Sequence, residues 1–292
     1  MGYLPIEVPW KLLAGFMTED GAIDYVKRQG VQLTEKELED TRKRVREARS
    51  HVGKLPSRRD LKPGIQPIPQ SMQEHLASLE LEPTFKEHTQ GSLDSRFALV
   101  EVGKLVAFQT ILNVEYLDSL MKQVPKPSDS EETLKFCLPS RKEKGTERIL
   151  NNFNPDTNTF SVITDNLDFR IVGNVQGEDS QTGRRFLGFA FGGGLRQMSV
   201  AQYQDRFILK NGYHRACALE QAGHRFIPVL IVKVPSFELT GANRPGFFPV
   251  DVVTGDKPPT MSDFLGPSAI EVRRLKLKLI VSIHAEVQAI PV

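Results

Sequence analysis

The segment 206–234 constrains the fold more than any other part of the chain. Its sequence, RFILKNGYHRACALEQAGHRFIPVLIVKV, is typical of a strand, a tight glycine turn, a helix of about ten residues and a second strand. Gly212 lets the backbone turn sharply at the end of the first strand, where φ is expected to be positive and no Cβ blocks a ligand. The first-turn amides of the following helix are unpaired and together carry about half a positive charge.

Two side chains in this first turn are suited to an anion. His214 and Arg215 follow Gly212 closely, so backbone amides and a guanidinium group would meet at one place. Phosphate is the natural occupant, because it accepts hydrogen bonds from amides and arginine can donate two parallel hydrogen bonds to it. The alternative is a turn that only joins strand to helix, with His214 and Arg215 in surface hydrogen bonds. The spacing alone favours neither interpretation.

The order of residues in this segment resembles the second signature of the ParB partition proteins, and its Gly-Tyr-His-Arg is similar to the Gly-Cys-His-Arg of sulfiredoxin. The matching positions are Gly212, Arg215, Ala218, Ala222, Gly223 and the run 227–229. Residues 98–109 (ALVEVGKLVAFQ) look like the family's first strand and loop, and 116–121 like the intervening helix. The resemblance implies a nucleotide phosphate at the turn, as for CTP in ParB and ATP in sulfiredoxin.

The resemblance also implies a set of site residues. The ligand-binding residues would be Asn211, Gly212, Tyr213, His214, Arg215 and Gln109. His214 and Arg215 would stabilise charge on a transferring group, and Glu101 would accept a proton from the substrate. The cofactor would be ATP or CTP, with Mg²⁺ bridging the phosphates.

Tyr213 stands where sulfiredoxin has its nucleophilic cysteine and ParB a glutamate, so reduction of a sulfinic acid by that route is excluded. We expect its ring to pack on a β-rich insertion that exposes Phe186, Leu187 and Phe189. Tyr213→Phe should then preserve stability and ligand binding, whereas Tyr213→Ala should lose on the order of 3 kcal/mol.

The pattern along the chain predicts an α+β fold with a mixed-sheet ParB/sulfiredoxin-like core. Residues 1–92 form a helical N-terminal extension and linker, with a capping box at Thr34 and Glu37. Residues 93–250 form the core domain, with a β-rich insertion at about 137–200 that is interpreted as an antiparallel meander. Residues 251–292 form a wrapping tail and a last helix around 268–287.

Composition narrows the functional classes. The 38 Lys and Arg nearly balance the 36 Asp and Glu, which argues against a dedicated nucleic-acid or membrane-surface protein. Cys137 and Cys217, the only cysteines, are expected to be buried and inert. No apolar run approaches the length of a membrane span and no secretory signal is evident, so we expect a cytoplasmic protein.

These observations favour a protein that binds a phosphate-containing ligand, most plausibly a nucleotide, with phosphoryl transfer or nucleotide hydrolysis as the chemistry if any occurs. One alternative is a non-catalytic module that binds a protein, through the N-terminal arm or the β-rich insertion, or a nucleic acid. Another is a metal-dependent nuclease. The carboxylates available for that role, Asp165, Asp168, Glu178 and Asp179, lie in predicted turns, and no metal site is predicted.

Overall fold

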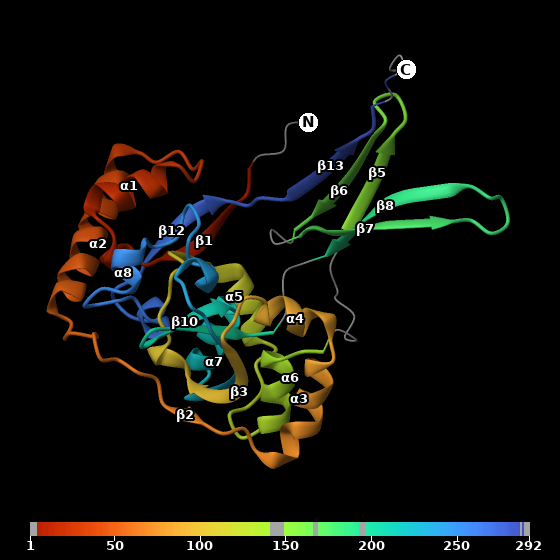
Figure 1. Ribbon diagram of the computed structural model, residues 1–292. Coiled ribbons are helices and arrows are strands. Elements are labelled where there is room, and N and C mark those ends of the chain that lie inside the picture. Colours follow the sequence, from red (N-terminus) through yellow and green to blue (C-terminus); the bar gives the residue numbers. More distant parts are fainter. Residues whose placement is uncertain (1–4, 141–148, 166–168, 193–196, 287, 289–292) are drawn as a thin grey trace. The chain divides into compact units, whose positions relative to one another are not determined.

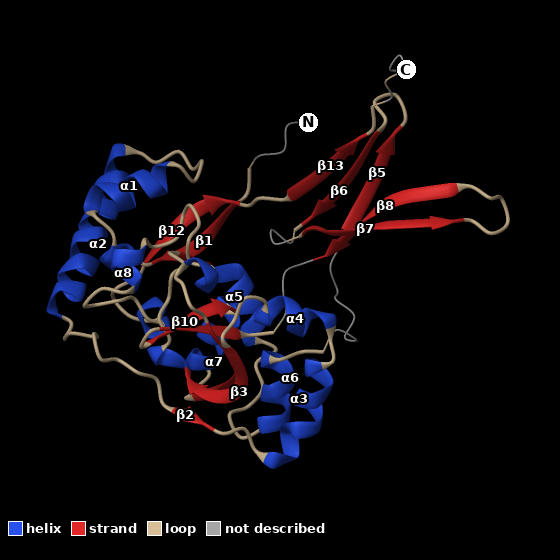
Figure 2. Cartoon of the chain, in the orientation of Figure 1, coloured by secondary structure: helices blue, strands red, loops and turns tan. Residues whose placement is uncertain are grey.

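The chain divides into two compact units. The computed structural model describes residues 5–140, 149–165, 169–192, 197–286 and 288. The larger unit comprises residues 1–142 and 196–275, and the smaller comprises 143–195 and 276–292. Helices and strands mix in the larger unit, as predicted, and the described part of the smaller unit contains strands (Figures 1 and 2).

A five-stranded mixed sheet forms the centre of the larger unit, with the strand order β10-β9-β11-β3-β2. The strands are β2 (Ile65–Gln66), β3 (Asp94–Glu101), β9 (Ser199–Tyr203), β10 (Arg206–Asn211) and β11 (Phe226–Lys233). Strand β11 pairs antiparallel with β3 and parallel with β9. Helix α7 (Tyr213–Gln221) connects β10 to β11, so the predicted strand–turn–helix–strand order of residues 206–234 is confirmed.

A second sheet of the same unit, ordered β12-β1-β4, joins segments from the two ends of the chain. Its strands are β1 (Glu7–Leu12), β4 (Ile111–Asn113) and β12 (Ile270–Leu275). Helices α1 (Glu19–Lys27) and α2 (Glu35–Lys54) pack against it through a separate apolar cluster (Figure 2). The predicted capping box at the start of α2 is present. The N-terminal segment is therefore built into a folded core.

The predicted last helix around 268–287 is wrong. The structure has two strands there, β12 and β13 (Leu279–His284). Burial alternates along the start of β12, where Ile270 and Val272 are buried and Glu271 and Arg273 are exposed. A period of two matches a strand and not a helix.

The remaining helices cover the central sheet or belong to the tail. They are α3 (Gln73–Glu80), α4 (Pro83–Thr89), α5 (Val114–Met121), α6 (Ser130–Cys137) and the short α8 (Val250–Val253). The tail wraps the core as predicted: Phe237, Phe248 and Phe264 are buried, and Phe247 packs against the same cluster.

The described part of the smaller unit contains two small sheets instead of the predicted continuous meander. Strands β5 (Ile149–Asn154), β6 (Thr159–Thr164) and β13 form one, in the order β13-β6-β5. Strands β7 (Arg170–Glu178) and β8 (Arg185–Gly192) form a hairpin. Within the described residues β6 pairs with β13 from the end of the chain and not with β7, which local turn signals could not indicate.

Candidate functional site

The turn before α7 has the backbone that the sequence predicts. Gly212 has φ +100° and ψ 26°, a left-handed conformation that glycine adopts without steric cost. A Cβ at this position would lie 2.6 Å from Cγ of the buried Met198. Gly212 is the N-cap residue of α7, and no side chain caps the first turn. The helix therefore begins with amides that have no intrahelical acceptor.

Tyr213 is a buried structural residue. Its hydroxyl accepts a hydrogen bond from the Phe108 amide at 2.9 Å, and its ring packs edge-to-face on Phe108 with centroids 5.4 Å apart. Burial raises the pKa of Tyr213 above its ordinary value. The predicted packing on the insertion is wrong, because Phe186, Leu187 and Phe189 belong to the smaller unit and are exposed.

His214 is neutral and already has a hydrogen-bond partner. Its Nε2 accepts from the Asn113 amide at 3.0 Å, which leaves the proton on Nδ1. The ring also packs edge-on against Tyr116. Burial lowers the pKa of His214 to about 4. The predicted role in stabilising phosphate charge needs a cation, which the neutral ring does not supply.

Arg215 and Asn211 connect the turn to neighbouring elements. Arg215 donates to the carbonyls of Phe136 and Cys137, at 3.0 and 3.2 Å. A cation placed at the last carbonyls of α6 is stabilised by the helix dipole. The side-chain amide of Asn211 donates to the Gln197 carbonyl at 2.9 Å. Both residues thus hold the elements around the turn in place.

Gln109 lies close to the turn and Glu101 does not. Gln109 forms a bridge with Phe247 and follows Phe108, the partner of Tyr213. Glu101 pairs with Phe226 at the start of β11, beyond the other end of α7. A nine-residue helix spans about 13 Å, so Glu101 is remote from the turn.

The carboxylate of Glu101 serves a structural role. It accepts from the Gly64 amide at 3.0 Å and pairs with Lys104 and Arg225, at 2.9 and 3.3 Å. Burial raises its pKa, but the hydrogen bonds from Lys104 and Gly64 outweigh that effect and the pKa lies below its ordinary value. An ionised carboxylate with three donors is a poor general base.

Two cations that the sequence did not single out, Lys210 and Arg244, influence one another in the folded chain. Lys210, two residues before Gly212, is half-buried, and burial and the charge of Arg244 lower its pKa. Among the described residues, neither Lys210 nor Arg244 forms an ion pair with a carboxylate. The two residues come from β10 and from the tail, so no sequence spacing relates them.

Lys210 also influences a buried histidine. His88 on α4 donates from Nε2 to Oε1 of Gln197 at 3.0 Å, and its Nδ1 has no partner among the described residues. Burial lowers the pKa of His88 to about 4, and the charges of Lys210 and Arg215 act in the same direction. The hydrogen bond from Asn211 to the Gln197 carbonyl connects His88 to the turn.

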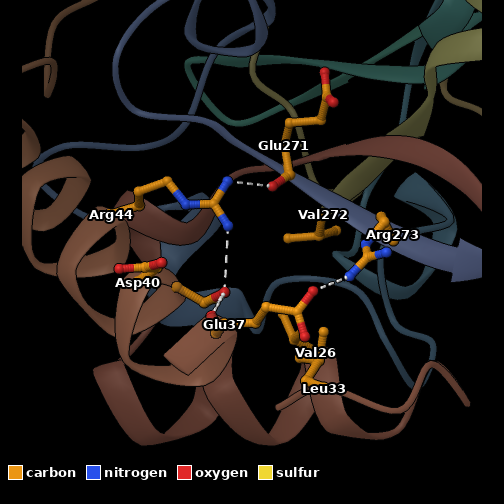
Figure 3. Close-up of a pocket in the computed structure, with 9 residues that line it drawn as sticks. Val26, Leu33, Glu37, Asp40, Arg44, Glu271, Val272 and Arg273 are labelled. Atoms are coloured by element: carbon orange, nitrogen blue, oxygen red, sulfur yellow. Dashed lines mark hydrogen bonds and ion pairs between the residues drawn. The ribbon is translucent and has the colours of Figure 1, made fainter. Parts of the chain in front are cut away.

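A cavity of about 480 Å³ lies elsewhere in the larger unit, between α2 and β12 (Figure 3). Its floor is apolar and its rim carries charges of both signs. The lining residues are Val26, Leu33, Glu37, Asp40, Thr41, Arg44, Glu271, Val272 and Arg273. This cavity could not be expected from the sequence, because the wall opposite α2 is the unpredicted strand β12.

Nucleophile and metal chemistry find little support among the described residues. Cys137 and Cys217 are buried as expected, and burial raises the pKa of each to about 12. No group of three His, Cys, Asp or Glu in the described residues could hold a metal ion. Asp179 accepts bonds from Gln181 and Thr182 within its turn, as predicted, and Asp165 lies 3.8 Å from Lys278. Asp168 lies outside the described residues.

The chain matches no protein-family model, and comparison with curated proteins and with solved structures finds no match. In the described residues, no helix is long and apolar enough to cross a membrane.

Proposed function

We propose that the larger unit is a ParB/sulfiredoxin-like domain that binds a phosphate-containing ligand, a nucleotide, at the amino end of α7. One observation carries the proposal: the half-buried Lys210 and the neighbouring Arg244 have no carboxylate partner among the described residues. The charge of Arg244 disfavours the protonated form of Lys210, and a bound anion would favour it. The first-turn amides that follow Gly212 have no intrahelical acceptor and add positive potential at the same end of the helix.

The proposal changes the residues assigned to the ligand. Lys210 and Arg244 supply the charge that His214 cannot, and Arg215 contributes while it holds the carbonyls of α6. Mg²⁺ would arrive with the nucleotide phosphates, because the described residues contain no metal-binding group of their own. With Tyr213 and His214 engaged in structural hydrogen bonds, the proposal assigns binding to this turn and no phosphoryl transfer.

Calorimetric titration with ATP and with CTP, each in the presence of Mg²⁺, tests the proposal. Lys210→Gln should weaken binding by about tenfold or more, because a charge-assisted phosphate contact is lost. Lys233→Gln is the matched control, since Lys233 is an exposed lysine on strand β11 of the same sheet. If neither nucleotide releases heat, or if both variants titrate like the wild type, the anion site is wrong.

The smaller unit supports a second function, binding of a protein. Its strands expose many large apolar side chains: Ile149, Leu150, Phe153, Ile171, Val172, Val175, Phe186, Leu187, Phe189 and Ile280. Exposed apolar side chains on strands with unpaired edges favour association with another chain. The partner to which we commit is a second copy of this chain, since the hairpin β7–β8 offers such edges on every copy.

Analytical ultracentrifugation tests this second function. The wild type should sediment faster as its concentration rises, and Leu187→Lys should abolish that dependence. Leu81→Lys is the control, since Leu81 is exposed on the larger unit. A wild type that remains monomeric at every concentration would exclude self-association.

A further inference from the structure

The cavity between α2 and β12 has the size and the floor of a small-molecule site. Its volume, about 480 Å³, lies in the range of pockets that hold metabolites. Val26 and Val272 are buried at its base, and Leu33 is half-buried beside them. An aliphatic group placed on this floor would remove its own surface and part of that of Leu33 from water.

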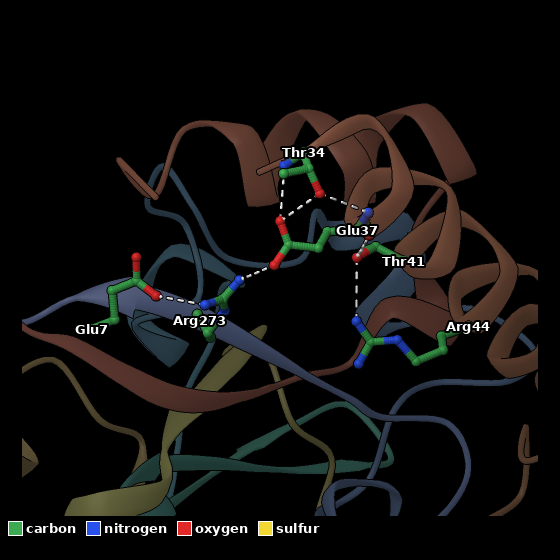
Figure 4. Close-up of polar contacts among 6 residues, drawn as sticks. All are labelled: Glu7, Thr34, Glu37, Thr41, Arg44 and Arg273. Atoms are coloured by element: carbon green, nitrogen blue, oxygen red, sulfur yellow. Dashed lines mark hydrogen bonds and ion pairs between the residues drawn. The ribbon is translucent and has the colours of Figure 1, made fainter. Parts of the chain in front are cut away.

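One wall of the cavity is a closed network of ion pairs. Arg273 donates to Glu37 at 2.6 Å and to Glu7 at 2.9 Å (Figure 4). Glu37 also accepts from the amide and the hydroxyl of Thr34, which holds its pKa below the ordinary value. Each charge on this wall has a partner of opposite sign, so the wall has little to offer a charged ligand.

Further along α2, the lining has a cation and an anion that are not paired with each other. Arg44 donates to two neutral acceptors, the Glu271 carbonyl at 2.8 Å and the Thr41 hydroxyl at 3.2 Å. Its guanidinium group has five N–H donors, and three of them remain available for a ligand. Asp40, one helical turn earlier, forms no hydrogen bond or ion pair among the described residues. Figure 3 shows Arg44 and Asp40 on one side of the cavity and Arg273 on the other, with Val272 between them.

We propose that this cavity binds a free α-amino acid with an aliphatic side chain. The carboxylate binds Arg44, the ammonium group binds Asp40, and the side chain lies on Val26, Leu33 and Val272. An α-amino acid carries its two charges a few ångströms apart, which suits two side chains separated by one turn of the same helix. A purely apolar ligand would make no use of the exposed charges of Asp40 and Arg44.

The only tryptophan of the chain is a built-in reporter for this site. Trp10 on β1 is paired with Val272 in the sheet and packs in the same apolar cluster as Val26. A ligand on Val272 should therefore change the fluorescence of Trp10. Titration of the full chain with leucine, followed by fluorescence and by calorimetry, should give a saturable response.

Charge variants test the assignment of each group. Arg44→Gln should weaken leucine binding by about tenfold or more, and Arg44→Lys by less. Arg49→Gln is the control, since Arg49 is exposed on the same helix and does not line the cavity. Asp40→Asn should weaken binding of leucine but not of 4-methylpentanoate, which lacks the ammonium group. The proposal is overturned if leucine, isoleucine and valine all give no response, or if Arg44→Gln binds leucine like the wild type.

Discussion

The hydroxyl of Tyr213 accepts a hydrogen bond from the amide of Phe108 at 2.9 Å. The two residues lie 105 positions apart in the sequence, and their bond joins the first residue of α7 to the loop between β3 and β4. The ring packing expected from the sequence is present, but its partner is this loop. Tyr213 thus serves the architecture of the larger unit.

Tyr213→Phe is predicted to destabilise the protein, contrary to the expectation from sequence alone. The variant keeps the ring but removes the hydroxyl that accepts from the buried Phe108 amide, at a cost of about 1–3 kcal/mol. Urea denaturation of the variant and of Tyr116→Phe provides the measurement, since the side chain of Tyr116 is half exposed. Equal midpoints for Tyr213→Phe and the wild type would show that the hydroxyl contributes nothing.

Replacement of a glycine by alanine is predicted to cost more stability at one end of α7 than at the other. Gly212 and Gly223 both have positive φ, at +100° and +90°. A Cβ at Gly223 meets nothing within 4 Å, so Gly223→Ala should cost only the backbone penalty of about 1–2 kcal/mol. Gly212→Ala adds an overlap with the buried Met198 and should cost at least about 1 kcal/mol more. Chemical denaturation measures the free energy of unfolding of both variants. Equal losses would show that the overlap with Met198 does not destabilise the protein.

The local part of the fold could be predicted from the sequence, because periodicity and turn chemistry are local signals. The glycine turn, α7 and the capping box of α2 belong to this part. Sheet partners could not be predicted: β12 pairs with β1 across more than 250 residues, and the charge-rich alternation in residues 270–284 was assigned to a helix. Register between distant strands depends on burial that no short window contains.

In the candidate site, too, local sequence signals do not show which distant groups a side chain contacts. Gly212, His214 and Arg215 were identified from spacing, but spacing could not show that His214 accepts from Asn113 or that Arg215 reaches the carbonyls of α6. Lys210 and Arg244 could not be identified as site residues from the sequence, because the tail comes to lie beside β10 only in the folded chain. The roles of side chains in this site therefore depend on partners that only the folded chain supplies.

Arg58→Ala is predicted to be strongly destabilising. Arg58 in the proline-rich linker pairs with the buried Asp263 through both guanidinium nitrogens, at 2.5 and 3.1 Å. Asp263 also accepts from Thr260 and Ser268, so loss of Arg58 leaves a buried carboxylate without a cation, at a cost of about 3–5 kcal/mol. Thermal melts should show a much smaller loss for Arg59→Ala, whose side chain is exposed. Equal melting temperatures for the two variants would contradict this role.

Stability is predicted to fall on acidification because two histidines are held neutral. Burial lowers the pKa of His88 and of His214 from 6.5 to about 4. Between these values the unfolded chain binds more protons than the folded chain, so the stabilisation is complete above about pH 6.5 and is lost as the pH falls toward 4. For the fully buried His88 the loss amounts to up to roughly 3 kcal/mol.

Urea unfolding at a series of pH values measures this loss. His214→Gln retains a side-chain acceptor for the Asn113 amide but does not titrate, so its free energy of unfolding should fall less steeply between about pH 6.5 and 4. Carboxylates with lowered pKa values, such as Glu101, contribute chiefly below that window and are unchanged in the variant. A slope in His214→Gln equal to that of the wild type would show that His214 takes up its proton equally well in the folded and unfolded chains.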